Sequence, residues 1–89
     1  MIMTIEEAKD VLRADGEEYD PLILPLLTAI PDYLEATTGR RWDTELVHPL
    51  AKFTAGQILI IWFDGPDKDR SRIIDGLLTA LTALGRMQA

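Results

Sequence analysis

The stretch DPLILPLLTAIPDYLEATTG, residues 20–39, decides the fold expected of this chain. It opens on Asp20 and Pro21, a pair favoured at a helix start. The aspartate caps free amides, and a proline there loses only an amide that had no partner. The last residue of the stretch is Gly39. We expect the helix to end there, because glycine readily adopts the left-handed conformation that ends helices. The sequence therefore predicts one helix across the stretch, with Asp20 as its N-terminal cap.

The polarity of this helix divides its surface into three strips. A narrow solvent stripe recurs at spacings of four and three residues: Pro21, Pro25, Thr28, Asp32 and Glu35. An apolar flank lies on each side of it, one with Leu22, Leu26, Ala29 and Tyr33, the other with Ile23, Leu27, Ile30 and Leu34. One core needs only one such face, so the second flank predicts a contact between subunits. Pro31 predicts a kink, because it removes a backbone hydrogen bond in mid-helix.

A shorter helix is expected before this one. Thr4 and Glu7 have the spacing of a capping box, in which each side chain accepts from the other residue's amide. Apolar residues then follow with helical spacing: Ile5, Ala8 and Leu12, with Val11 beside them. This helix should end in the acidic loop ADGEEYD, residues 14–20, where Gly16 favours a turn.

Two further helices are expected after residue 39. His48 and Pro49 begin one that runs through Phe63; its segment ILIIWF, residues 58–63, also fits a buried strand on pattern alone. The last helix, within residues 70–87, carries an apolar seam: Ile74, Leu77, Leu81 and Leu84. Trp62 and Phe63 are expected in the core. The prediction is an all-α fold, a small bundle of about four helices, forming a single domain over residues 1–89.

Composition leaves catalysis and cofactor binding without support. The chain has no cysteine and one histidine, which excludes thiolate zinc sites and multi-histidine metal sites. His48 stands at a helix start, where capping is favoured over catalysis. The acidic loop lacks the ligand spacing of an EF-hand, so a solvated loop is preferred to a calcium site: Asp15, Glu17, Glu18 and Asp20. We expect a non-enzymatic protein without a cofactor or metal.

No stretch has the length of about 20 apolar residues that a membrane helix needs, so we expect no membrane span. The segment MIMTIEEAKD, residues 1–10, also lacks the basic start and apolar run of a signal peptide.

The charge is concentrated in the first half of the chain. The net charge is −6, and residues 1–45 hold eleven acidic and four basic side chains. The negative electrostatic field of this half of the chain disfavours binding to the phosphate backbone of a nucleic acid. Arg40 and Arg41 therefore indicate cations at a helix C-terminus, or partners for acidic residues of a neighbouring subunit, rather than a nucleic-acid contact. Trp42 is expected to anchor on the core, with a partner contact as the alternative.

The order of these motifs resembles the head–tail connector family of long-tailed bacteriophages and prophages, small proteins that complete the head beneath the portal. The opening of that family is matched by Thr4, Glu6, Glu7, Ala8, Lys9, Leu12, Arg13 and Asp15. Its second-helix ending is matched by Tyr33, Leu34, Glu35, Gly39 and Arg40, and its closing segment by Gly76, Leu77, Leu78 and Arg86. The chain departs from the family at Pro25 and Pro31, and its loop after Trp42 is short.

The resemblance implies a virion protein at the head–tail junction, made in the host cytoplasm. It would form a homo-oligomeric ring on the portal protein, extend the channel through which DNA passes non-specifically, and offer a platform to a tail or stopper protein. Candidate subunit or partner contacts are Leu22, Leu26, Tyr33, Arg40, Arg41 and Trp42. Candidate lumen-facing acidic residues, which would keep passing DNA from adhering, are Glu17, Glu18, Asp32 and Glu35.

Three other functions compete with this one. A small acidic helical regulator, of the antitoxin or anti-repressor type, would use the negative charge to bind a basic protein. A helix-turn-helix DNA binder is disfavoured because the only candidate turn is acidic where a recognition helix should be basic. An enzyme comes last and would have to depend on His48.

Overall fold

The computed structural model describes residues 1–87 and consists of four α-helices. They are α1 (Ile5–Leu12), α2 (Asp20–Thr38), α3 (Pro49–Asp64) and α4 (Lys68–Met87). No strand occurs within residues 1–87, so the prediction of an all-α fold of four helices is confirmed. Residues 58–63 are helical, which settles the alternative between helix and strand there.

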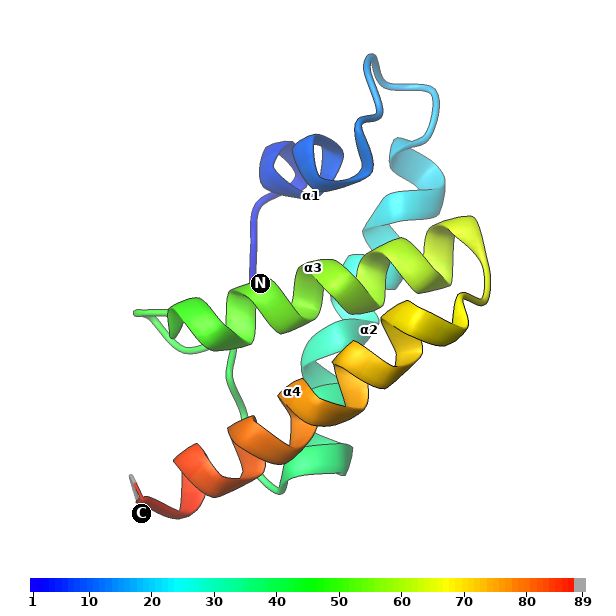
Figure 1. Cartoon of the computed structure of the whole chain (residues 1–89). Coiled ribbons are helices and arrows are strands. Elements are labelled where there is room, and N and C mark those ends of the chain that lie inside the picture. The colour runs from blue at the N-terminus through cyan, green and yellow to red at the C-terminus, as the bar shows by residue number, and fades with distance from the viewer. Residues whose placement is uncertain (88–89) are drawn as a thin grey trace.

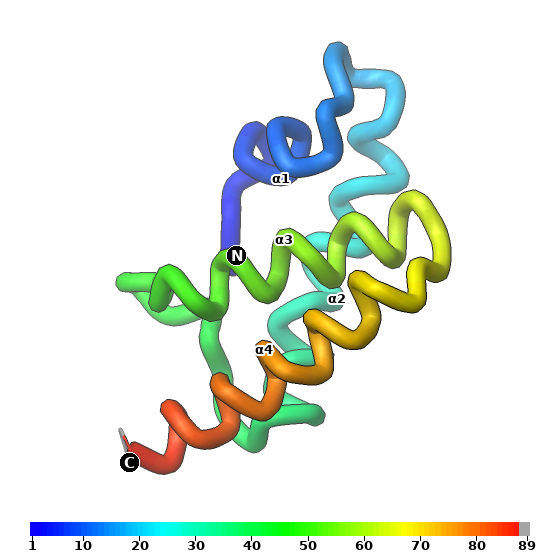
Figure 2. Tube along the Cα trace, viewed as in Figure 1, coloured from blue at the N-terminus to red at the C-terminus, as the bar shows by residue number. Residues whose placement is uncertain are grey.

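Helices α2 and α3 each contact all three other helices. Helix α2 passes behind α3 and α4 in the view of Figure 1. Helices α3 and α4 pack side by side and are joined by a tight turn (Figure 2). Helix α1 lies across the top of the molecule against α2 and α3.

The predicted flanks of α2 are found where the sequence places them. The inner flank is fully buried: Ile23, Leu27, Ile30 and Leu34. It belongs to one core cluster with small and branched residues of α3 and α4: Ala51, Ala55, Ile58, Leu59, Ile74 and Leu81. The polar stripe of α2 is exposed along its whole length. Alanines on α3 permit a close approach of the helices, because the distance between helix axes depends on the side chains at the contact.

Three predicted helix ends are confirmed. The hydroxyl of Thr4 accepts from the amide of Glu7 at 3.1 Å, and the Glu7 carboxylate accepts from the amide of Thr4 at 3.0 Å. Gly39 ends α2 with φ of 87°, and its amide donates to the carbonyl of Glu35. Nδ1 of His48 accepts from the amide of Leu50 at 3.1 Å, so this histidine caps α3.

The predicted cap of α2 is wrong. Tyr19 occupies the N-cap position without a side-chain hydrogen bond, and Asp20 is the first helical residue. The Asp20 carboxylate instead lies 2.9 Å from Nζ of Lys9, on α1. An ion pair to another helix therefore replaces the local cap, and it links the start of α2 to α1.

Helix α1 ends just before the expected loop, and α2 continues through both of its prolines. Arg13 provides the left-handed residue that ends α1, with φ of 57°. Helix α2 is a single continuous element, although it contains Pro25 and Pro31. The side chain of Pro31 is buried, so packing against the core holds the helix together where a backbone hydrogen bond is missing.

The segment before α1 belongs to the core, which the sequence did not indicate. Ile2 is fully buried and Met3 is 4% exposed. Trp62 and Phe63, expected in the core, are half-buried at its edge. Val11 is more exposed than its place beside the apolar face of α1 suggested.

The two flanks of α2 should differ sharply in their contribution to stability. Leu34→Ala removes a fully buried side chain and should lower the free energy of unfolding by about 2 to 5 kcal/mol. Leu22→Ala is the matched control on the same helix, and it should change that free energy by less than about 0.5 kcal/mol. Urea denaturation of the two variants measures the difference, and equal losses would contradict the assignment of inner and outer flanks.

Candidate interaction surfaces

The outer flank of α2 remains open to solvent. Leu22 is 60% exposed and Tyr33 is 37% exposed, while Leu26 is half-buried. The ring of Tyr33 meets Trp62 of α3 edge-on, with centroids 5.4 Å apart. This contact orients the tyrosine without covering the flank, which therefore remains available to another molecule.

Trp42 is an anchor within its own chain. It is 4% exposed, and its Nε1 donates to the hydroxyl of Thr38 at 2.8 Å. The guanidinium of Arg40 lies 5.4 Å from the centre of the indole ring and donates to the carbonyl of Gly85 at 3.2 Å. The predicted packing of Trp42 on the core is confirmed. Arg40 joins the ends of α2 and α4 and is engaged within the chain.

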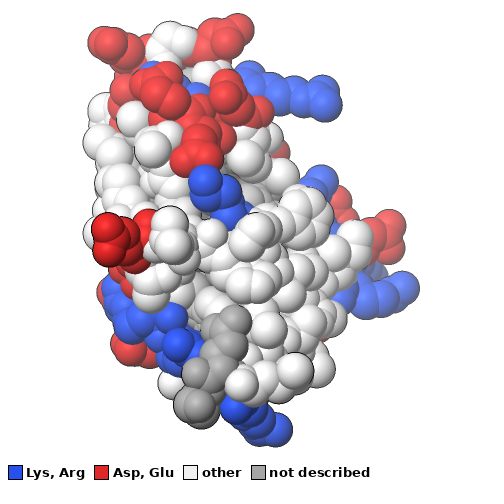
Figure 3. Space-filling view, turned by 90° about the vertical axis from the view of Figure 1, so that its left-hand side faces the viewer, with Lys and Arg blue, Asp and Glu red and all other residues white. Residues whose placement is uncertain are grey.

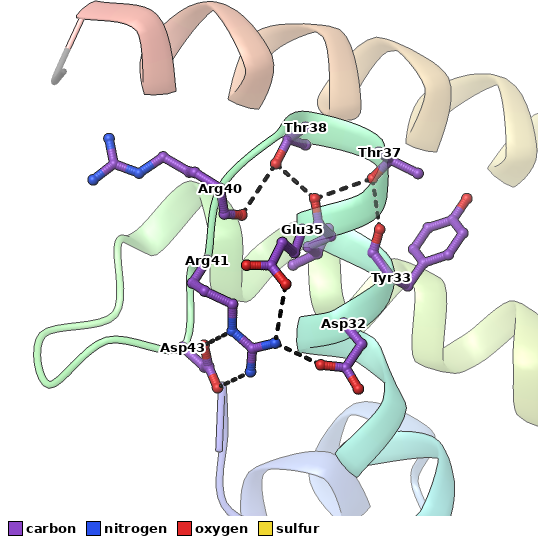
Figure 4. Close-up of polar contacts among 9 residues, drawn as sticks. Asp32, Tyr33, Glu35, Thr37, Thr38, Arg40, Arg41 and Asp43 are labelled. Carbon is purple, nitrogen blue, oxygen red and sulfur yellow. Dashed lines mark hydrogen bonds and ion pairs between the residues drawn. The ribbon is translucent and has the colours of Figure 1, made fainter.

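Arg41 forms ion pairs with carboxylates of its own chain. It makes two hydrogen bonds to Asp43, at 3.0 and 2.7 Å, and it pairs with Asp32 and, at 3.7 Å, with Glu35 (Figure 4). The Arg41 side chain holds the pKa of Asp43 below its ordinary value. Asp43 and then Asp32 raise the pKa of Arg41 in turn.

The four acidic residues predicted to line a lumen fall into two groups. Glu17 and Glu18 are exposed in the loop between α1 and α2. Asp32 and Glu35 lie in the second half of α2, where Arg41 compensates part of their charge. Their environments therefore differ, and the loop pair carries the uncompensated charge.

Acidic side chains are most densely grouped at one end of the molecule. They gather over α1 and the loop that follows it, at the top of Figure 3, and the surface below them is largely uncharged with scattered basic and acidic side chains. The exposed or half-exposed carboxylates of this end are Glu6, Glu7, Asp10, Asp15, Glu17 and Glu18. Within residues 1–87, no three His, Cys, Asp or Glu side chains are grouped so that they could hold a metal ion. No helix in that range has the length and apolarity to cross a membrane.

An apolar groove between α1 and α3 is a feature that the sequence analysis missed. Its volume is about 410 Å³, and its lining residues are Met3, Glu7, Val11, Pro49, Lys52, Phe53, Gly56 and Gln57. Phe53 is 55% exposed and Val11 is 37% exposed. Gly56 faces Val11 of α1, and a Cβ there would lie 3.6 Å from a methyl group of Val11, an ordinary van der Waals distance. Phe53 lies on the exposed side of α3, away from the core. An aromatic residue on the exposed side of this helix was the one feature of the sequence that could have indicated the groove.

One ion pair borders this groove. Nζ of Lys52 lies 2.6 Å from a carboxylate oxygen of Glu7. Lys52, followed by the amide of Thr4, lowers the pKa of Glu7. The two charges compensate each other, so the edge of the groove is close to neutral at this point.

No family model matches the sequence, and no curated protein or solved structure is significantly similar to it. Inference about function therefore depends on the surfaces of the molecule itself and on the resemblance of its motifs.

The two lowered carboxyl pKa values predict how stability depends on pH. Glu7 and Asp43 have pKa values below the ordinary 4.5 and 3.8, so their ion pairs stabilise the fold fully above those values. The free energy of unfolding should fall as the pH is lowered through and below that range, because protonation removes the charges. Denaturation at a series of pH values measures this. The Glu7→Gln/Asp43→Asn variant should show a shallower loss, and an unchanged slope would contradict the assignment.

Proposed function

We propose that this protein is a non-catalytic structural subunit of a phage head–tail connector. Copies of it form a ring beneath the portal protein, extend the DNA channel and present a platform to a tail or stopper protein. The observation that carries the proposal is the outer flank of α2, with Leu22 60% exposed on a helix whose opposite flank is fully buried. The order of the sequence motifs supplies the class of assembly.

Association with another copy would bury this apolar flank, which the chain itself leaves exposed to solvent. Single exposed leucines are ordinary on protein surfaces. Here Leu22, Leu26 and Tyr33 stand at helical spacing on one face and form a continuous strip. Removing such a surface from water contributes about 25 cal/mol per Å², so a neighbour that covers it stabilises both molecules.

The acidic loop fits the passage of DNA in such a ring. Glu17 and Glu18 are exposed, and neither has an ion-pair partner within residues 1–87. On the inner wall of a channel they repel the phosphate backbone and keep DNA from adhering. Asp32 and Glu35 contribute less to that field, because Arg41 shares their charge.

A second candidate, the acidic regulator, is favoured by the charge at one end of the molecule (Figure 3). A basic protein partner would dock there by electrostatic attraction, which weakens as salt screens the charges. This function would also give the outer flank of α2 a role in binding, but it does not explain the order of the sequence motifs, so it ranks second.

The proposal predicts concentration-dependent rings. Gel filtration with light scattering should show large oligomers at high protein concentration or after addition of the portal protein from the same genome, and electron microscopy should show rings. Leu22→Asp should reduce assembly while the midpoint of thermal unfolding stays close to that of the parent chain. A small oligomer of fixed size that does not bind the portal protein but binds a basic protein would support the regulator function instead.

A further inference from the structure

A hollow lies where the ends of α2 and α4 meet, and two arginine side chains line it. Its volume is about 330 Å³, and its lining residues are Thr38, Gly39, Arg40, Thr82, Gly85 and Arg86. We call it the arginine hollow. No carboxylate of residues 1–87 lies within ion-pair distance of Arg40 or Arg86. The positive charge of the hollow is therefore unpaired in the part of the chain that the structure describes.

Arg40 is half-buried, and contacts on two sides fix its position. Its guanidinium donates to the carbonyl of Gly85 at 3.2 Å and lies 5.4 Å from the centre of the Trp42 ring. A Cβ on Gly85 would lie 3.0 Å from Cδ of Arg40, closer than ordinary van der Waals contact, so the glycine leaves the room that this side chain occupies. A guanidinium that is already oriented loses little freedom when it binds a carboxylate, and its planar set of donors matches the two carboxylate oxygens.

The other charges near the arginine hollow do not replace such a partner. The C-terminal ends of α2 and α4 each carry about half an elementary negative charge, which is less than the full positive charge of each guanidinium. The nearby carboxylates of Asp32, Glu35 and Asp43 are bound to Arg41. Figure 4 shows the Arg40 side chain directed away from Arg41 and these carboxylates. The hollow therefore retains a positive charge that an anion would neutralise.

The opposite charge lies at the other end of α2. The acidic loop directly precedes this helix, and Arg40 directly follows its C-terminal cap. The 19 residues of α2 span about 28 Å, so the loop and the arginine hollow lie at opposite ends of the molecule (Figure 1). The acidic end has one exposed cation without an ion pair, Arg13, against five such carboxylates: Glu6, Asp10, Asp15, Glu17 and Glu18.

We propose that the arginine hollow of one copy binds carboxylates of the acidic loop from the next copy. This inference rests on the proposed ring and names a contact between its subunits. The hollow and the loop share no residue, so the contact is head-to-tail, and its repetition closes a ring when the rotation between copies permits. Two guanidinium groups neutralise only part of the acidic end, so the remaining carboxylates keep their charge for the channel.

Reversal of charge tests the contact. Arg86 is exposed, so Arg86→Glu should fold like the parent chain and lower the assembled fraction several-fold, as measured by gel filtration with light scattering. Arg72→Glu is the matched control, because Arg72 is an exposed arginine of α4 outside the hollow and its replacement changes the net charge equally. This control should assemble several-fold better than Arg86→Glu.

The reciprocal change adds a test of pairing. Glu17→Lys/Glu18→Lys lowers the overall negative charge, and general repulsion between copies should then decrease. The proposed contact predicts the opposite result, a several-fold loss of assembly. Addition of Arg86→Glu to this variant should restore assembly, because the two charges are then exchanged. The midpoint of thermal unfolding of each variant shows that it is folded.

The outcomes separate the contact from the function. Equal assembly by Arg86→Glu and Arg72→Glu, or no recovery in the combined variant, would overturn the contact and leave the connector role standing. Recovery in assemblies that do not bind the portal protein would support the contact and count against that role. A monomer under every condition, with and without the portal protein, would overturn both.

Discussion

The buried flank of α2 is the contact on which the rest of the structure depends. Ile23, Leu27, Ile30 and Leu34 are fully buried, and their helix contacts all three others, as α3 also does. A chain of 89 residues has little surface with which to cover a second face of the same helix. The burial of its inner flank therefore fixes the core, while the outer flank remains exposed.

The parts of this fold that could be predicted from sequence are those that depend on near neighbours or on helical period. The capping box of Thr4 and Glu7, the end of α2 at Gly39 and the cap at His48 each involve residues a few positions apart. The two flanks of α2 follow from its period alone. Only part of the candidate contact surface could therefore be predicted. The helical spacing of apolar residues identifies the strip, but it does not show which other residues pack against the strip.

The predictions that failed, and the features that were missed, involve partners distant in sequence. The carboxylate of Asp20 forms an ion pair with Lys9 on another helix and does not cap α2. The groove exists only because α1 packs across α3 beside Phe53 and Gly56, an arrangement that no local pattern encodes. The network of Arg41 is the exception, because its partners Asp43 and Asp32 lie only two and nine residues away. It joins α2 to the loop beyond it and compensates part of the acidic charge there.

The distribution of charge also bears on how copies can meet. Carboxylates without an ion pair are closely grouped over α1 and its following loop, so contacts that bring two such ends together are disfavoured by repulsion. This selects against a two-fold, head-to-head pairing and leaves head-to-tail contacts less hindered. In the proposed ring, the orientation of the outer flank is fixed within each copy, because the inner side of α2 is fully buried in the core. The rotation from one copy to the next would then be set by the packing of α2 within each chain. The number of subunits in a ring would follow from the same core that holds the monomer together, so substitutions that shift α2 relative to α3 would alter ring size before they abolished folding.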